Sequence, residues 1–146
     1  MENYRRIMAL DMGEKRIGVA LSDPLGLTAQ GLEVYQRTTT AKDLAYLTAL
    51  FREREASGLL IGVPRHMNGE IGPEAEKIMG FGQRLGDNCG VEPIFWDERL
   101  TTVQAERALL EANVRRSRRR QVIDQVAAVL ILENYLRFGA LQKNED

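Results

Sequence analysis

Three acidic residues stand where a purely structural role would not select a carboxylate. Asp11 ends an apolar run, Glu98 follows another, and Asp124 interrupts the apolar stretch 122–132. Carboxylates are rarely buried without a partner, and Asp is a poor residue for a helix interior. Mg²⁺ and Mn²⁺ prefer oxygen ligands, and such ions serve phosphoryl chemistry. The three acids therefore predict a catalytic site that holds one or two Mg²⁺ or Mn²⁺ ions.

Each acid also has an ordinary interpretation. Asp11 would suit the turn before Gly13, Glu98 would suit a nearby helix N-terminus, and Asp124 would suit a solvated helix position. Asp97 competes with Glu98 for one role, because adjacent strand residues point to opposite faces. We favour Glu98, whose longer side chain can reach past a strand end, and we keep Asp97 as the alternative.

A basic segment follows these acids along the chain. From Arg99 to Arg120 there are seven arginines and two acidic residues, and five of the arginines fall within six positions. Guanidinium forks match phosphate oxygens, so this segment predicts contact with a nucleic-acid backbone. The alternative is a solvated loop. The candidate nucleic-acid contacts are Arg16, Arg99, Arg115, Arg116, Arg118, Arg119 and Arg120.

A polar loop at 65–72 supplies weaker candidates. Arg65, His66 or Asn68 could contact substrate, and His66 could act as a general base. An ordinary turn closed by Asn68 and Gly69 is the competing interpretation.

Composition predicts one domain over residues 1–146, with a polar tail at 138–146. The chain is 44% hydrophobic and 28% charged, with a formal net charge of −1, which is typical of a globular protein. One cysteine and one histidine exclude an internal disulfide and Cys- or His-rich zinc sites. No apolar run reaches the roughly 18 residues that a spanning helix needs. We expect a cytoplasmic protein with no membrane partner.

Periodicity predicts a mixed α/β sheet with helices on its faces. The first two strands should form an antiparallel hairpin, with Gly13 free to take a positive φ in its turn. The continuous apolar run 58–64 is typical of a strand with parallel neighbours. If the first and last strands are parallel, Asp11 and Glu98 share one sheet edge. The predicted strands are 5–11, 16–22, 31–37, 58–64 and 91–96, and the helices are 41–55, with Thr40 as its N-cap, 73–87, 101–112 and 118–137.

Four motifs resemble the YqgF/RuvX family over about residues 5–137. They are Leu10-Asp11-Met12-Gly13, Ile61-Gly62-Val63-Pro64, Asp97-Glu98-Arg99-Leu100-Thr101-Thr102 and Asp124-Gln125-Val126-Ala127-Ala128. The resemblance implies a ribonuclease H-like fold, with a five-stranded mixed sheet whose first three strands are antiparallel. It implies a metal-dependent endonuclease that matures the 5′ end of the small-subunit ribosomal RNA precursor or resolves Holliday junctions. It also implies that Asp11, Glu98 and Asp124 occupy the family's acidic positions, whereas Arg65–Asn68 departs from the family pattern.

Two other functions compete with the nuclease. A nucleic-acid-binding factor for ribosome assembly or transcription could use the same fold with little catalysis. An actin-like phosphotransferase also opens with Asp-x-Gly, but it needs two lobes and this chain supplies one. Junction resolution would need two active sites and hence a homodimer.

Overall fold

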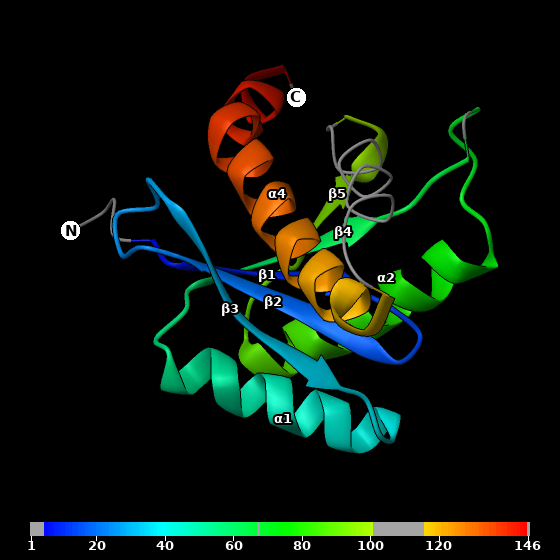
Figure 1. The fold of residues 1–146 in the computed structure, drawn as a ribbon. Helices are drawn as coiled ribbons and strands as arrows, with labels where there is room; N and C mark the ends of the chain where they lie inside the picture. The colour runs from blue at the N-terminus through cyan, green and yellow to red at the C-terminus, as the bar shows by residue number, and fades with distance from the viewer. Residues whose placement is uncertain (1–4, 67, 101–115, 146) are drawn as a thin grey trace.

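The computed structural model describes residues 5–66, 68–100 and 116–145, and for residues 100, 116–124 and 140–145 it describes the backbone alone. Its centre is a five-stranded sheet in the order β3-β2-β1-β4-β5 (Figure 1). The strands are β1 (Ile7–Met12), β2 (Arg16–Ser22), β3 (Ala29–Gln36), β4 (Gly58–Val63) and β5 (Ile94–Asp97). β1, β2 and β3 pair antiparallel, and β4 pairs parallel with both β1 and β5. The predicted mixed sheet and hairpin are confirmed.

Helices cover both faces of the sheet. α1 (Thr40–Glu53) and α2 (Pro73–Cys89) pack on one face, and α4 (Arg116–Glu145) crosses the other (Figure 1). A short 3₁₀ turn, η1 (Glu98–Leu100), follows β5. No helix in the described ranges is long and apolar enough to cross a membrane.

The strand alternation assigns each side chain of β1 to one of these faces. Met8, Leu10 and Met12 join the apolar cluster under α1 and α2. Ile7 and Ala9 join the cluster under α4, where Ala20, Ala127 and Ala128 are also buried. Small side chains on both surfaces let α4 lie close to the sheet. Asp11, which alternates with Ala9, therefore belongs to the α4 face.

The β1–β2 turn depends on glycine for a reason that differs from the prediction. Gly13 does not have a positive φ. Its N–H donates to the Arg16 carbonyl at 2.8 Å, and a Cβ on Gly13 would lie 2.7 Å from that same oxygen. The backbone approaches too closely to admit a side chain, so the constraint is contact rather than a left-handed conformation.

Helix ends differ modestly from the predicted ones. Thr39, not Thr40, caps α1, and its hydroxyl accepts from the Lys42 N–H at 3.2 Å. α4 continues through most of the predicted polar tail to Glu145, because residues such as Ala140 and Lys143 are good helix formers. The predicted helix 101–112 lies outside the described residues.

Candidate active site

Two of the predicted acids are buried on the same face of the sheet. Asp11 is 3% exposed and Glu98 is 5% exposed. Asp11 is next to last in β1, and Glu98 begins η1 directly after β5. Since β1 and β5 both run parallel to β4, these acids come from strand ends at one edge of the sheet, as predicted.

Gly62 of β4 fixes the position of Glu98. A Cβ on Gly62 would lie 2.9 Å from Glu98 Oε1 and 2.5 Å from Ile131 Cδ1 of α4. The Glu98 carboxylate therefore lies over β4 and against α4, in space that only a glycine leaves open. Gly62 follows Ile61, the partner of Leu10 in β1, so the carboxylate lies over the strand next to Asp11.

Asp97 points away from this face and binds arginines. It pairs with Val63, whose side chain lies under α1 and α2. Its Oδ2 accepts from Arg99 Nη2 at 2.7 Å and lies 3.8 Å from Arg65 Nε. Burial would raise the pKa of Asp97, but the hydrogen bonds from Arg99 and the two positive charges outweigh it and lower that pKa below its ordinary value. The geometry thus separates Asp97 from Glu98.

The loop after β4 packs beside Asp97. Arg65 Nη1 donates to the Gly69 carbonyl at 3.3 Å. Asn68 Oδ1 accepts from the Glu70 N–H at 3.0 Å. This bond agrees with the interpretation of Asn68 as a turn residue. His66 is exposed, with Nε2 next to Gly72.

The remaining predicted residues are only partly described. Asp124 and the arginines at 116 and 118–120 belong to the backbone of α4, but their side chains lie outside the described part, as does Arg115 altogether. Arg16 is half-buried at the start of β2. Among the described side chains, which do not include that of Asp124, no three His, Cys, Asp or Glu residues gather as a metal site.

The donor set fits a hard divalent cation. Asp11 and Glu98 bring carboxylate oxygens into a nearly dry environment, and oxygen ligands suit Mg²⁺ and Mn²⁺. Cys89 packs against the apolar cluster of the opposite face, under α1 and α2, and so adds no thiolate to this donor set.

Asp43 is a buried acid that the sequence analysis did not single out. It is 1% exposed, and it accepts hydrogen bonds from Tyr35 Oη at 2.8 Å, Arg37 Nε at 3.0 Å and the Thr38 N–H at 2.9 Å. Burial would raise its pKa, but these hydrogen bonds and the Arg37 charge lower it. Asp43 therefore ties the end of β3 to the first turn of α1. Asp43 stands in the first turn of a predicted helix, where an acid is ordinary, so the sequence alone did not distinguish it.

Comparisons with known proteins agree with this geometry. The family model described as "RuvX: Holliday junction resolvase" matches residues 5–138. A protein from Moorella thermoacetica is 56% identical over 131 residues, covering 90% of this chain and 94% of its own. One from Clostridioides difficile is 49% identical over 133 residues, covering 91% and 94%. Both relatives carry the name "Putative pre-16S rRNA nuclease".

Solved structures show the same fold at low sequence identity. RuvC of Thermus thermophilus, in complex with a Holliday junction substrate, is 13% identical, with a TM-score of 0.59 over 92% of this chain and 96% of that one. The fowlpox virus Holliday junction resolvase is 13% identical, with a TM-score of 0.51 over 93% and 99%.

The mixed sheet, with buried carboxylates where two of its parallel strands end, has a ribonuclease H-like fold, and the family model and the named relatives identify the chain as a nuclease of that fold. This confirms the fold that the sequence motifs implied. The chain belongs to the RuvX family of Holliday junction resolvases.

Proposed function

We propose that this chain is a metal-dependent endonuclease that matures the 5′ end of the 16S ribosomal RNA precursor. The observation that carries the proposal is the burial of Asp11 and Glu98 on one face of the sheet, where β1 and β5 end. The names of the relatives at about 50% identity support the RNA substrate. A precursor of ribosomal RNA also makes the cytoplasm the expected location.

Asp11 and Glu98 would hold one or two Mg²⁺ or Mn²⁺ ions, and Asp124 is the proposed third ligand. A divalent cation in such a site orients the attacking water and stabilises the charge that develops on the phosphate. The protein's own part is to hold both carboxylates in place. Gly62 leaves the space for Glu98, and α4 covers that side of the sheet through Ile131.

The reaction is hydrolysis at phosphorus. A water oxygen attacks in line with the bond from phosphorus to the 3′ oxygen, that bond breaks, and the products are a 5′-phosphate and a 3′-hydroxyl. Arginines hold the strand during this step, because guanidinium groups pair with phosphate oxygens. Arg99, which Asp97 orients through Nε and Nη2, is the proposed arginine nearest to Glu98 in sequence.

The test compares Asp11→Asn and Glu98→Gln with wild type on a precursor RNA in Mn²⁺. Loss of a ligand should remove several kcal/mol of transition-state stabilisation, which slows cleavage by at least about a hundredfold. Asp97→Asn is the matched control, since its carboxylate faces the other side of the sheet, and it should retain more activity than Glu98→Gln. An Asp11→Asn variant that cleaves as fast as wild type would contradict the assignment.

The same assay distinguishes the competing binding factor. A binding factor would retain salt-sensitive RNA binding in both variants and in EDTA, while the wild-type chain shows no metal-dependent cleavage.

A four-way DNA junction is the second candidate substrate, favoured by the family description and by the fold shared with RuvC. Cutting a junction symmetrically needs two active sites, so we propose a homodimer for this activity. Sedimentation of the protein on a synthetic junction should then show two chains per junction, and one chain per junction would argue for the RNA substrate.

A further inference from the structure

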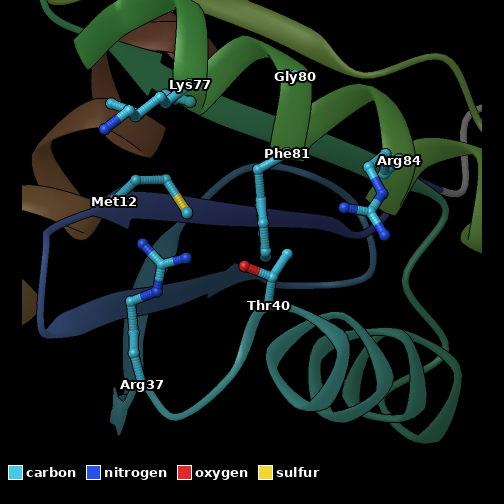
Figure 2. A pocket seen from close by; sticks show the side chains of 8 residues that line it. Met12, Arg37, Thr40, Lys77, Gly80, Phe81 and Arg84 are labelled. Atoms are coloured by element: carbon cyan, nitrogen blue, oxygen red, sulfur yellow. The ribbon is translucent and has the colours of Figure 1, made fainter.

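A cleft of about 420 Å³ lies on the face of the sheet opposite α4 (Figure 2). It separates α2 from the ends of β1 and β3 and from the start of α1. Its polar lining is Arg37, Thr40, Lys77 and Arg84, and its apolar lining includes Met12 and Phe81. A second hollow of about 520 Å³ shares Met12, Arg37 and Lys77 and reaches Gly13. The two form one groove along α2 that ends at the β1–β2 turn, two residues beyond Asp11.

Arg37 is held rigidly in this groove. Its Nε donates to Asp43 at 3.0 Å, its Nη1 donates to the Gly13 carbonyl at 3.1 Å, and its guanidinium lies 5.4 Å from the centre of the Phe81 ring. Figure 2 shows the guanidinium projecting into the space beside Phe81, with the Thr40 hydroxyl facing the same space. A preorganised arginine loses little side-chain entropy when it binds an anion.

Lys77 and Arg84 add two cations from the same face of α2. They are seven residues apart, which is two turns or roughly 10 Å along the helix. Both are exposed, and neither forms an ion pair with another described residue. In Figure 2 the Arg84 guanidinium lies on the side of Phe81 away from Arg37, and Lys77 lies on the side of Met12. The groove therefore carries positive charge that the described protein does not neutralise.

Gly80 lies between these two cations and has no packing explanation. A Cβ on Gly80 would meet nothing within 4 Å, and its φ is not positive. Glycine in a helix interior costs about 0.5–1 kcal/mol relative to alanine. A ligand that approaches the α2 backbone closely would explain why a glycine is present.

We propose that this groove binds phosphate groups of the nucleic-acid chain where the chain passes along α2. The phosphate lies over Gly80, between Lys77 and Arg84 on α2, with Arg37 across the groove. Glu14 and Glu74 line the opposite end of the groove, next to Gly13, so the positive charge is concentrated away from that end. The inference rests on the proposed nucleic-acid substrate and adds a contact outside the catalytic face. A free nucleotide presents the same phosphate chemistry, and the experiment separates the two sources.

The experiment measures binding of single-stranded RNA by fluorescence anisotropy in EDTA, at several salt concentrations. Arg84→Gln and Lys77→Gln should each weaken binding and reduce the slope of log affinity against log salt by about 0.7. Arg54→Gln, at the other end of α1, makes the same charge change outside the groove and should leave the slope unchanged.

Gly80→Ala is a variant whose loss of RNA binding could not be attributed to unfolding. It should raise Tm by roughly 1–4 °C, because alanine is the better helix former, and yet weaken RNA binding. Competition by adenosine monophosphate at low concentration, lost in Arg84→Gln, would identify a free nucleotide as the occupant rather than an RNA chain and would overturn the nucleic-acid assignment.

The outcomes separate this inference from the proposed function. If the groove variants lose RNA affinity while wild type cleaves nothing, the groove stands and the nuclease proposal fails. If wild type cleaves RNA and the groove variants bind it with unchanged affinity and salt slope, the groove proposal is overturned. Absence of RNA binding by the wild-type chain would overturn it as well.

Discussion

Gly62 is the residue on which the position of a candidate ligand depends most directly. Gly62→Ala would place a methyl group 2.5 Å from Ile131 Cδ1 and 2.9 Å from Glu98 Oε1. We expect this substitution to destabilise the fold by about 1–3 kcal/mol and to slow cleavage by displacing Glu98. Urea denaturation and the RNA cleavage assay measure the two effects.

A glycine with open surroundings supplies the control for that substitution. Gly80→Ala should stabilise the fold by about 0.5–1 kcal/mol, because no atom opposes its Cβ. Equal effects of the two substitutions on stability would show that contact with Glu98 and Ile131 is not the cause.

Asp43 should make stability depend on pH in the acid range. Its folded-state pKa lies below the ordinary value of 3.8, so the unfolded chain binds more protons as pH falls through that value. The contribution of Asp43 is therefore present above about pH 5 and is lost progressively as the pH falls below 3.8 and through the folded-state pKa. Asp43→Asn should cost about 2 kcal/mol at pH 7 and progressively less at pH 3.5 and below.

Urea titrations of wild type and Asp43→Asn across that range test the prediction. Asp87→Asn, at an exposed position of α2, is the control and should change the free energy of unfolding by less than about 0.5 kcal/mol. A gap between wild type and Asp43→Asn that stays constant from pH 7 to pH 3 would contradict the role of the charge.

At the scale of elements, the contact between α4 and β3 should set where Asp124 lies. Gln125, the neighbour of Asp124, packs its side chain over Gly31, where a Cβ would lie 2.6–2.9 Å from three of its atoms. Gly31→Ala should therefore shift the first turns of α4 and slow RNA cleavage. Adding Gln125→Ala removes the obstructing side chain and should restore the rate.

The double variant makes this prediction specific. If Gly31→Ala and Gln125→Ala have independent effects, their changes in activation free energy add, whereas residues in contact show an interaction energy. Additive effects would mean that this contact does not position the helix.

Periodicity carried most of the element predictions because burial dictates it. The run at 58–64 is apolar throughout since β4 lies between two parallel strands, and the β1–β2 hairpin follows from two apolar runs with a short turn. Periodicity could not predict which face of the sheet a side chain points to at the end of a strand. Glu98 reaches the α4 face because a 3₁₀ turn begins there, and Asp97 is held on the other side by Arg65 and Arg99.

Contacts between side chains that are far apart in the chain could not be predicted from the sequence either. Arg37 looks like an ordinary strand-end cation until the fold brings Asp43, Gly13 and Phe81 around it. The groove beside it joins residues of β1, α1 and α2 that are as far apart as Met12 and Arg84. The sequence motifs did identify the acids of the opposite face, because those residues interrupt apolar runs.

At the scale of the whole molecule, the two faces of the sheet have different proposed functions, one in catalysis and one in binding phosphate. The α4 face holds the candidate ligands Asp11 and Glu98, and the α1–α2 face holds the groove with Arg37 and Arg84. They meet at the β1–β2 turn. A nucleic-acid strand that contacted both faces would bind over a greater length than one that contacted the catalytic face alone.

Metal binding should stabilise the whole fold if the acids are its ligands. A ligand that binds only the folded state stabilises it by about 2.7 kcal/mol at one hundred times its dissociation constant, which raises Tm by several degrees. We expect Mn²⁺ to raise the Tm of wild type and of Asp97→Asn and to leave the Tm of Glu98→Gln nearly unchanged, because Glu98, unlike Asp97, shares the face of Asp11. Thermal unfolding with a Mn²⁺ titration measures this without any substrate. Equal shifts of Tm in Asp97→Asn and Glu98→Gln would place the metal away from the α4 face. The buried Glu98 would then have a structural role only.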